Sequence, residues 1–130
     1  MADTCREFQH TVSDYLIRNR SILDVMSKFQ EACAHVNRAV VKTVTNCGCL
    51  EIEAGKQPIP PNTSLSEVTE YMQTHLKGKP CPNCLEIIEA ELGNMLFYLT
   101  AYCSLFDLDL KKIIAKENDR ISTLGVYSLT

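Results

Sequence analysis

Apolar side chains recur every three or four residues along most of this chain, a spacing that predicts α-helices. The first run follows the capping box Thr4-Cys5-Arg6-Glu7, and the second follows a cap at Ser21 and continues to about Thr45. We therefore expect two helices in the first part of the chain. Their apolar positions are Phe8, Val12, Tyr15 and Leu16, and then Ile22, Met26, Phe29, Cys33, Val36 and Val40.

The longest run of helical spacing begins near Cys84 and continues through Phe106, and its length predicts the central helix of the fold. Before it, the capping box Ser64-Leu65-Ser66-Glu67 predicts a third helix that ends at Gly78. The apolar positions of these two helices are Leu65, Val68, Met72 and Leu76, and then Leu85, Ile88, Leu92, Met95, Leu99, Tyr102 and Phe106.

The remaining segments complete an all-α prediction, because no alternating run of strand length occurs. Asp109 can cap a short last helix through Lys116, and residues 47–62 have the proline content of a loop. We expect one domain over residues 1–121, an antiparallel bundle of four to five helices, and a tail over residues 122–130. Helices this short are marginal alone, so we also expect a homo-oligomer, a dimer or larger, that buries more of their apolar faces.

Composition excludes several classes of protein. The 130 residues suit a single domain, and the net charge of −3, without a long basic run, argues against nucleic-acid binding. The N-terminus has no apolar signal region, and no window approaches the roughly 18 apolar residues that span a bilayer. We therefore expect a cytoplasmic protein with no membrane contact.

Two tight cysteine pairs are the most informative chemistry in the sequence. Cys47 and Cys49 flank one glycine, and Cys81 and Cys84 form a Cys-x-x-Cys motif at the predicted start of the central helix. Four thiolates presented in two pairs are a typical tetrahedral zinc site, and a site with four protein ligands leaves no open position for catalysis. The sequence predicts a structural zinc ion that fastens the long loop.

Other fates of these thiols remain open. A Cys-x-x-Cys motif at a helix start is also typical of thioredoxin-like redox sites, although that interpretation requires a βαβ context that this chain lacks. Metal-free thiols or disulfides are further alternatives. Three more cysteines lie outside the pairs, and we expect Cys33 and Cys103 to be small buried apolar residues. Cys5 completes the total of seven, an odd number that excludes full disulfide pairing.

Residues 89–99 read Glu-Ala-Glu-Leu-Gly-Asn-Met-Leu-Phe-Tyr-Leu, and they are followed by Phe-Asp-Leu-Asp-Leu at 106–110 and Lys-Glu-Asn-Asp-Arg at 116–120. This succession resembles the MazG-like all-α nucleoside triphosphate pyrophosphohydrolases over residues 85–121. In that superfamily the corresponding helix carries Glu-x-x-Asp, and a short capped helix with a Lys/Asn motif follows. The resemblance implies a MazG-like fold and a nucleoside triphosphate substrate.

The resemblance also implies an Mg²⁺ site with an incomplete acidic set. Glu91 matches the family's glutamate, whereas Asn94 stands at the aspartate position and brings no negative charge. An earlier helix of the family carries a second acidic pair, of which Glu31 remains while Ala34 occupies the other position. The implied Mg²⁺ ligands are therefore Glu31, Glu91 and Asn94, with Glu89 as a further carboxylate nearby.

The implied nucleotide contacts are Lys116, Asn118, Arg120 and Tyr98. The three polar residues could equally form the ordinary polar end of a surface helix, and Tyr98 could pack in the core or in a dimer seam. His35 lies beside the apolar run of the second helix, where we expect a hydrogen-bonded structural residue.

Two functions follow from these observations. The first is a MazG-like nucleotide-binding protein with weak or divergent Mg²⁺-dependent pyrophosphohydrolase activity, stabilised by structural zinc. The second is a non-catalytic helical scaffold or regulatory module whose thiolate clip senses zinc or oxidants. Loss of two family carboxylates favours the second, and retention of Glu91 with the segment 116–120 favours the first.

Overall fold

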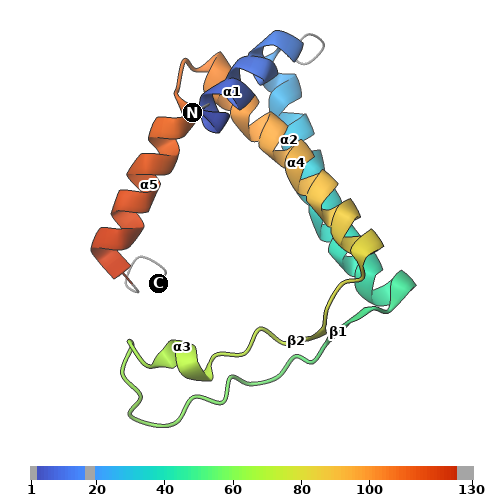
Figure 1. The fold of residues 1–130 in the computed structure, drawn as a ribbon, viewed down its shortest axis with the longest axis vertical. Helices are drawn as coiled ribbons and strands as arrows, with labels where there is room; N and C mark the ends of the chain where they lie inside the picture. The colour runs from blue at the N-terminus through green and yellow to red at the C-terminus, as the bar shows by residue number, and fades with distance from the viewer. Residues whose placement is uncertain (1–2, 17–19, 126–130) are drawn as a thin grey trace.

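A computed structural model describes residues 3–16 and 20–125 of the chain, and these residues are mostly helical, as the apolar spacing predicts (Figure 1). Five α-helices, one π-helical turn and one two-stranded antiparallel hairpin occur in the described part of the chain. In chain order the elements are α1 (Thr4–Tyr15), α2 (Ile22–Lys42), the π-helical turn η1 (Thr43–Cys47), β1 (Leu50–Ile52), α3 (Val68–Tyr71), β2 (Leu76–Gly78), α4 (Pro82–Leu105) and α5 (Leu110–Leu124).

The long helices α2 and α4 lie side by side and antiparallel, and they form the centre of the structure (Figure 1). Small side chains on α2 allow this close approach, since Ala32 and Ala39 are buried against α4. Near the end of the pair, the buried Thr43 satisfies its hydroxyl by donating to the carbonyl oxygen of Ala39 at 2.9 Å. The prediction of a long helix ending near Phe106 is confirmed by α4.

Helix α1 packs across the far end of this pair and closes a small core. Val12 and Leu16 are buried there with Val25 of α2 and Ala101 of α4. The hydroxyls of Ser13 and Ser104 are 2.7 Å apart at its edge. The core is small for a chain of this length, so much of the apolar surface of the helices is left exposed.

Helix α5 diverges from the α2 and α4 pair and is joined to the rest of the protein at its N-terminal end (Figure 1). The Gln9 side chain fixes this joint because its amide donates to the carbonyl oxygen of Leu108 at 2.6 Å and accepts from the N–H of Leu110 at 2.8 Å. Asp109 caps the helix as predicted, accepting from the N–H of Lys111 at 2.9 Å.

The structure corrects the prediction of a strand-free chain and of a long third helix. Residues Leu50 to Ile52 pair with Leu76 to Gly78 in an antiparallel hairpin, with Leu50 opposite Gly78. The helix expected from Ser64 to Gly78 is reduced to the four residues of α3. No described element packs against its apolar side, and Leu65, Met72 and Leu76 stay about half exposed. Without such burial a short helix gains too little to outcompete the strand pairing.

Helix boundaries account for two smaller corrections. The N-cap of α1 is Asp3, which accepts from the N–H of Arg6 at 3.2 Å, and Thr4 is already helical. The last helix extends past Lys116 to Leu124, into the segment expected to be a tail, and the rest of that tail, residues 126–130, lies outside the described residues.

Two glycine substitutions should change stability in opposite directions. Gly78 has φ +82°, and an added Cβ would lie 3.3 Å from the carbonyl oxygen of Cys49, whereas a Cβ on Gly93 in α4 meets open space. We expect Gly78→Ala to lower the free energy of unfolding by about 1–2 kcal/mol, and Gly93→Ala to raise it by about 0.5–1 kcal/mol. Urea unfolding of both variants measures these changes, and a shift of the same sign in both would contradict the assignment.

Candidate metal centre

The abrupt turn of the chain at the C-terminal end of α2 positions the first cysteine pair. The regular helix gives way to the π-helical turn η1, and Cys47 is its last residue. Gly48 follows in the left-handed region with φ +77°, and its N–H donates to the carbonyl oxygen of Thr43 at 3.0 Å. This turn reverses the chain so that Cys49 lies just before β1, on the same side as Cys47.

The second pair occupies the N-terminus of α4. Cys81 is the N-cap residue, Pro82 is the first helical residue, and Cys84 follows within the first turn. Proline fits this position because it has no N–H to satisfy and its φ is already helical. The exposed amides and the helix dipole at this end favour negative charge, which suits thiolates.

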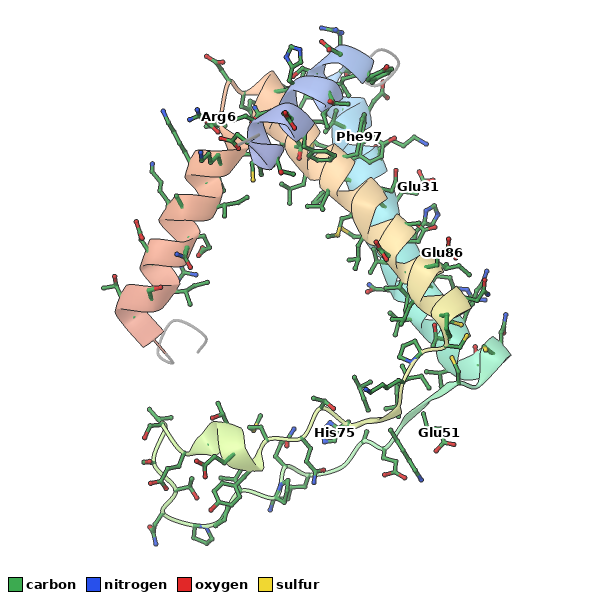
Figure 2. All side chains as sticks on the ribbon, viewed as in Figure 1. Arg6, Glu31, Glu51, His75, Glu86 and Phe97 are labelled. Atoms are coloured by element: carbon green, nitrogen blue, oxygen red, sulfur yellow. The ribbon has the colours of Figure 1, made fainter. Side chains whose placement is uncertain are left out.

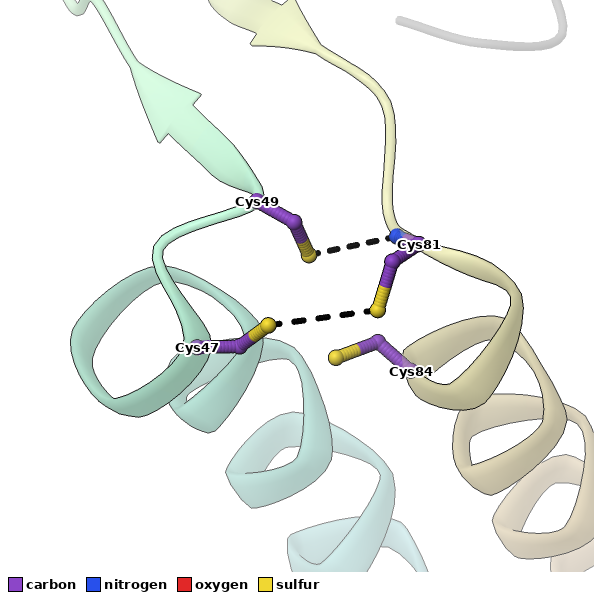
Figure 3. A group of neighbouring side chains, drawn as sticks. All are labelled: Cys47, Cys49, Cys81 and Cys84. Carbon is purple, nitrogen blue, oxygen red and sulfur yellow. Dashed lines mark hydrogen bonds between the residues drawn. The ribbon is translucent and has the colours of Figure 1, made fainter.

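These two turns bring the four sulfurs together, although 31 residues separate the pairs in sequence (Figure 3). The four Sγ atoms lie within 4.8 Å of one another, and those of Cys47 and Cys81 are 3.9 Å apart. The Cys81 backbone N–H also donates to the sulfur of Cys49 at 3.2 Å. All four cysteines are free, so the cluster is not a pair of disulfides. The predicted grouping of Cys47, Cys49, Cys81 and Cys84 is confirmed.

The geometry and the donor set of this four-cysteine cluster fit zinc. With Zn–S bonds of about 2.3 Å, tetrahedral sulfur ligands lie about 3.8 Å apart, close to the 3.9 Å between the sulfurs of Cys47 and Cys81. Four soft sulfur donors also select zinc over hard cations such as Mg²⁺. Exposure decreases across the cluster, from the exposed Cys47 to the buried Cys84. Zinc at this position would join the C-terminal end of α2 to the N-terminal end of α4.

Protons are distributed unevenly over the cluster. The backbone N–H of Cys84 and the Cys84 thiol donate to Cys81 and lower its pKa to about 7. The neighbouring Cys81 sulfur and burial raise the pKa of Cys84 to about 12, and the Cys49 sulfur raises the pKa of Cys47. Crowded thiols cannot all ionise because adjacent negative charges repel each other, and a bound divalent cation removes this obstacle.

A second group of polar side chains lies further along the α2 and α4 pair. Glu31 and His35 lie one turn apart on α2, with Oε1 of Glu31 4.0 Å from Nε2 of His35. Across the helix interface, Oε2 of Glu91 is 3.8 Å from Nδ1 of the same ring. Glu31 also lies 3.5 Å from the Nζ of Lys28. The structure thus places the two predicted carboxylates on either side of one imidazole.

His35, which the sequence predicts to be a structural residue beside the apolar run, is half exposed and lies between two carboxylates. Its spacing of four residues from Glu31 was the signal in the sequence that the two side chains lie close together.

Asn94 is exposed on α4, and Tyr98 packs edge-on against Phe97 with ring centroids 5.1 Å apart. Among the described residues, the four cysteines are the group whose ligand atoms converge closely enough to hold a metal ion as they stand.

The predicted phosphate contacts lie elsewhere. Lys116, Asn118 and Arg120 are exposed on α5, and Arg120 is paired with Glu117 of the same helix. Because α5 diverges from the α2 and α4 pair, one copy of the chain does not bring these residues to Glu31 and Glu91 (Figures 1 and 2). In Figure 2, Glu31 and Glu86 point to the side of the pair that faces away from α5.

Comparisons of the chain with protein-family models, with curated proteins and with solved structures give no match. Within the described ranges, no helix is long and apolar enough to cross a membrane.

Proposed function

We propose that the protein is a zinc-stabilised, MazG-like nucleotide-binding protein with weak, Mg²⁺-dependent nucleoside triphosphate pyrophosphohydrolase activity. The observation that carries this proposal is the position of Glu31 and Glu91, which lie 60 residues apart in sequence and flank the same imidazole across the α2 and α4 interface. The resemblance in residues 85–121 supplies the substrate class.

The chemistry of the reaction explains why the site needs a metal ion and oxygen ligands that hold it. Water attacks a phosphorus atom of the triphosphate and pyrophosphate leaves, so the site must hold Mg²⁺ against phosphate oxygens and neutralise their charge. Glu31, Glu91 and the Asn94 carbonyl would supply oxygen ligands of the kind that Mg²⁺ prefers, and bound phosphates would complete its shell. Fewer carboxylates weaken the metal site, which is why we expect low activity.

The four-cysteine cluster supports this site from a distance. It fastens the end of α2 to the start of α4, and these are the two helices that carry Glu31 and Glu91. A fixed end sets the register between two antiparallel helices, and the register decides which side chains face each other. In this role the zinc is structural and does not take part in hydrolysis.

A second candidate function rests on the exposed edge of the cluster. Cys47 is exposed, and its sulfur lies 3.9 Å from that of Cys81, a thiol whose lowered pKa of about 7 favours the reactive thiolate. A peroxide could oxidise this pair to a disulfide, with reduction of the peroxide to water and release of the zinc. The protein would then be a non-catalytic helical module that responds to oxidants.

Pyrophosphate release by zinc-loaded protein, with Mg²⁺ or Mn²⁺ and a panel of canonical and modified nucleoside triphosphates, tests the first proposal. We expect slow release that falls at least about 100-fold in Glu91→Ala, because a metal ligand is lost. The matched control is Glu86→Ala on the same helix, since Glu86 is exposed and makes no ion pair within the described residues. It should keep wild-type activity.

Three outcomes separate the candidates. Release that disappears in Glu91→Ala alone supports the pyrophosphohydrolase, whereas equal release from both variants indicates a contaminant and contradicts it. No release across the panel, together with zinc loss after peroxide treatment, supports the oxidant-responsive module.

A further inference from the structure

Helix α5 carries an apolar stripe that no other described part of the chain covers. Ile113, Ile114, Ile121 and Leu124 are each 40–49% exposed, and their spacing places all four on one side of the helix. Beyond Leu110, every described residue of α5 is exposed. We call these four residues the α5 stripe. A helix of 15 residues is marginally stable in water without a packing partner, so the α5 stripe is expected to pack against another element.

Helix α4 carries a matching surface, the α4 stripe, formed by Leu85, Leu92 and Leu96. These residues are 40–50% exposed, and their spacing of seven and four residues aligns them along the helix. The same spacing places them on one side of the contact with α2 and places Glu91 on the other. Met26 of α2 is also half exposed. Covering the α4 stripe would therefore leave Glu91 accessible.

The charges of the two helices are complementary. Helix α4 contains three glutamates and no lysine or arginine, whereas α5 contains four basic residues and two acidic ones. In the part of the chain that the structure describes, Glu86, Glu89, Lys112 and Lys116 form no ion pair. Opposite charges beside two apolar stripes favour packing of one helix on the other.

The joint of α5 prevents it from covering the α4 stripe of its own chain. The Gln9 amide holds both Leu108 and Leu110, and the Nζ of Lys111 lies 2.6 Å from a carboxylate oxygen of Asp3. Closing α5 onto α4 would break these contacts. Asp107, just before the joint, is already at φ +56°, which fixes the direction of the turn. A cover for the α4 stripe therefore comes from outside this chain, and the α5 helix of a second copy has the complementary charge.

We propose that the protein is a symmetric homodimer in which the α5 stripe of each copy packs on the α4 stripe of the other. A two-fold axis makes both contacts identical, so each copy gives one helix and receives one. Lys116 lies beside the α5 stripe and Glu89 beside the α4 stripe, so they form an ion pair between the copies. The proposal does not depend on the nucleotide activity, because Glu31 and Glu91 lie outside the interface.

Light scattering coupled to size-exclusion chromatography of the zinc-loaded protein tests the dimer. We expect twice the chain mass of 14.6 kDa. Ile114→Glu places a charge in the α5 stripe and should halve that mass. Ala115→Glu introduces the same charge one residue further, outside the stripe, and should leave the dimer intact. Circular dichroism and zinc content of both variants verify that they are folded. A monomeric wild-type protein, or a folded Ile114→Glu dimer, would overturn the proposal.

A charge exchange tests which helices meet. Glu89→Lys and Lys116→Glu should each weaken the dimer by roughly threefold to tenfold, because each places like charges together. A mixture of the two variants should recover dimerisation through the restored pair in the mixed dimer. Failure of the mixture to recover would overturn the placement of α5 on α4, even if the wild-type protein is a dimer.

Discussion

Replacing Cys84 with serine should abolish zinc binding and lower the melting temperature by about 10 °C or more. Cys84 is the buried member of the four-cysteine cluster, and it belongs to the first turn of α4. A serine oxygen is a poor zinc ligand at this position, and loss of the metal removes the link between α2 and α4. Structural zinc sites contribute on the order of 10 kcal/mol in small peptides, so a loss of several kcal/mol is expected here.

The matched control is Cys5→Ser, because Cys5 lies in α1, outside the cluster. It should keep one zinc per chain and a melting temperature close to that of the wild type. Elemental analysis and thermal unfolding, measured on the same samples, give both quantities. A strong chelator should bring the wild type to the stability of the Cys84→Ser variant. Zinc loss without any change in melting temperature would refute the structural role.

Zinc affinity should fall steeply as the pH is lowered. The pKa of Cys84 is raised to about 12 and that of Cys47 is also raised, so the metal-free protein holds both protons below pH 9, and zinc binding must release them. These two protons alone correspond to a change of about 100-fold in zinc affinity per pH unit. Below the pKa of Cys81, about 7, a further proton must leave and the dependence becomes steeper.

The sign follows from the proton count. The metal-free cluster binds more protons than the zinc-bound cluster, so the zinc-bound fold gains stability as the pH rises and loses it as the pH falls. Competition with a chromophoric chelator at pH 6, 7 and 8 measures the affinity directly. The Cys5→Ser variant should follow the wild-type curve. An affinity that does not change across this range would show that the thiols are not the ligands.

The four cysteines of the candidate metal centre could all be predicted from the sequence. Cysteine pairs separated by one and two residues present two sulfurs from one turn, whatever the rest of the fold does. The start of the central helix, predicted near Cys84 at the Cys-x-x-Cys motif, is confirmed by α4, which begins at Pro82. The sequence did not reveal that a π-helical turn at Thr43 and a left-handed Gly48 aim the first pair at the second. These backbone conformations depend on tertiary contacts, which the spacing of residues along the sequence does not reveal.

The third helix was predicted from a capping box at Ser64 and from apolar spacing, and neither signal shows whether another element covers its apolar side. Spacing tells which side of a helix is apolar, but a helix this short forms only if something buries that side. Met72 and Leu76 find no such partner, and strand pairing with β1 takes the segment instead. The neighbours of His35 depend on tertiary structure for a related reason, since only the contact between α2 and α4 brings Glu91 to its ring.

The sequence by itself determined the helical class, the approximate ends of α2 and α4, and the four cysteines of the candidate metal centre, because helix spacing, caps and cysteine pairs act over a few residues. Only the tertiary structure decided that Glu31 and Glu91 meet at His35, that residues 50–78 form a hairpin, and that α5 stands away from α4. Those results depend on which surfaces are buried, and burial is a property of the whole packed chain.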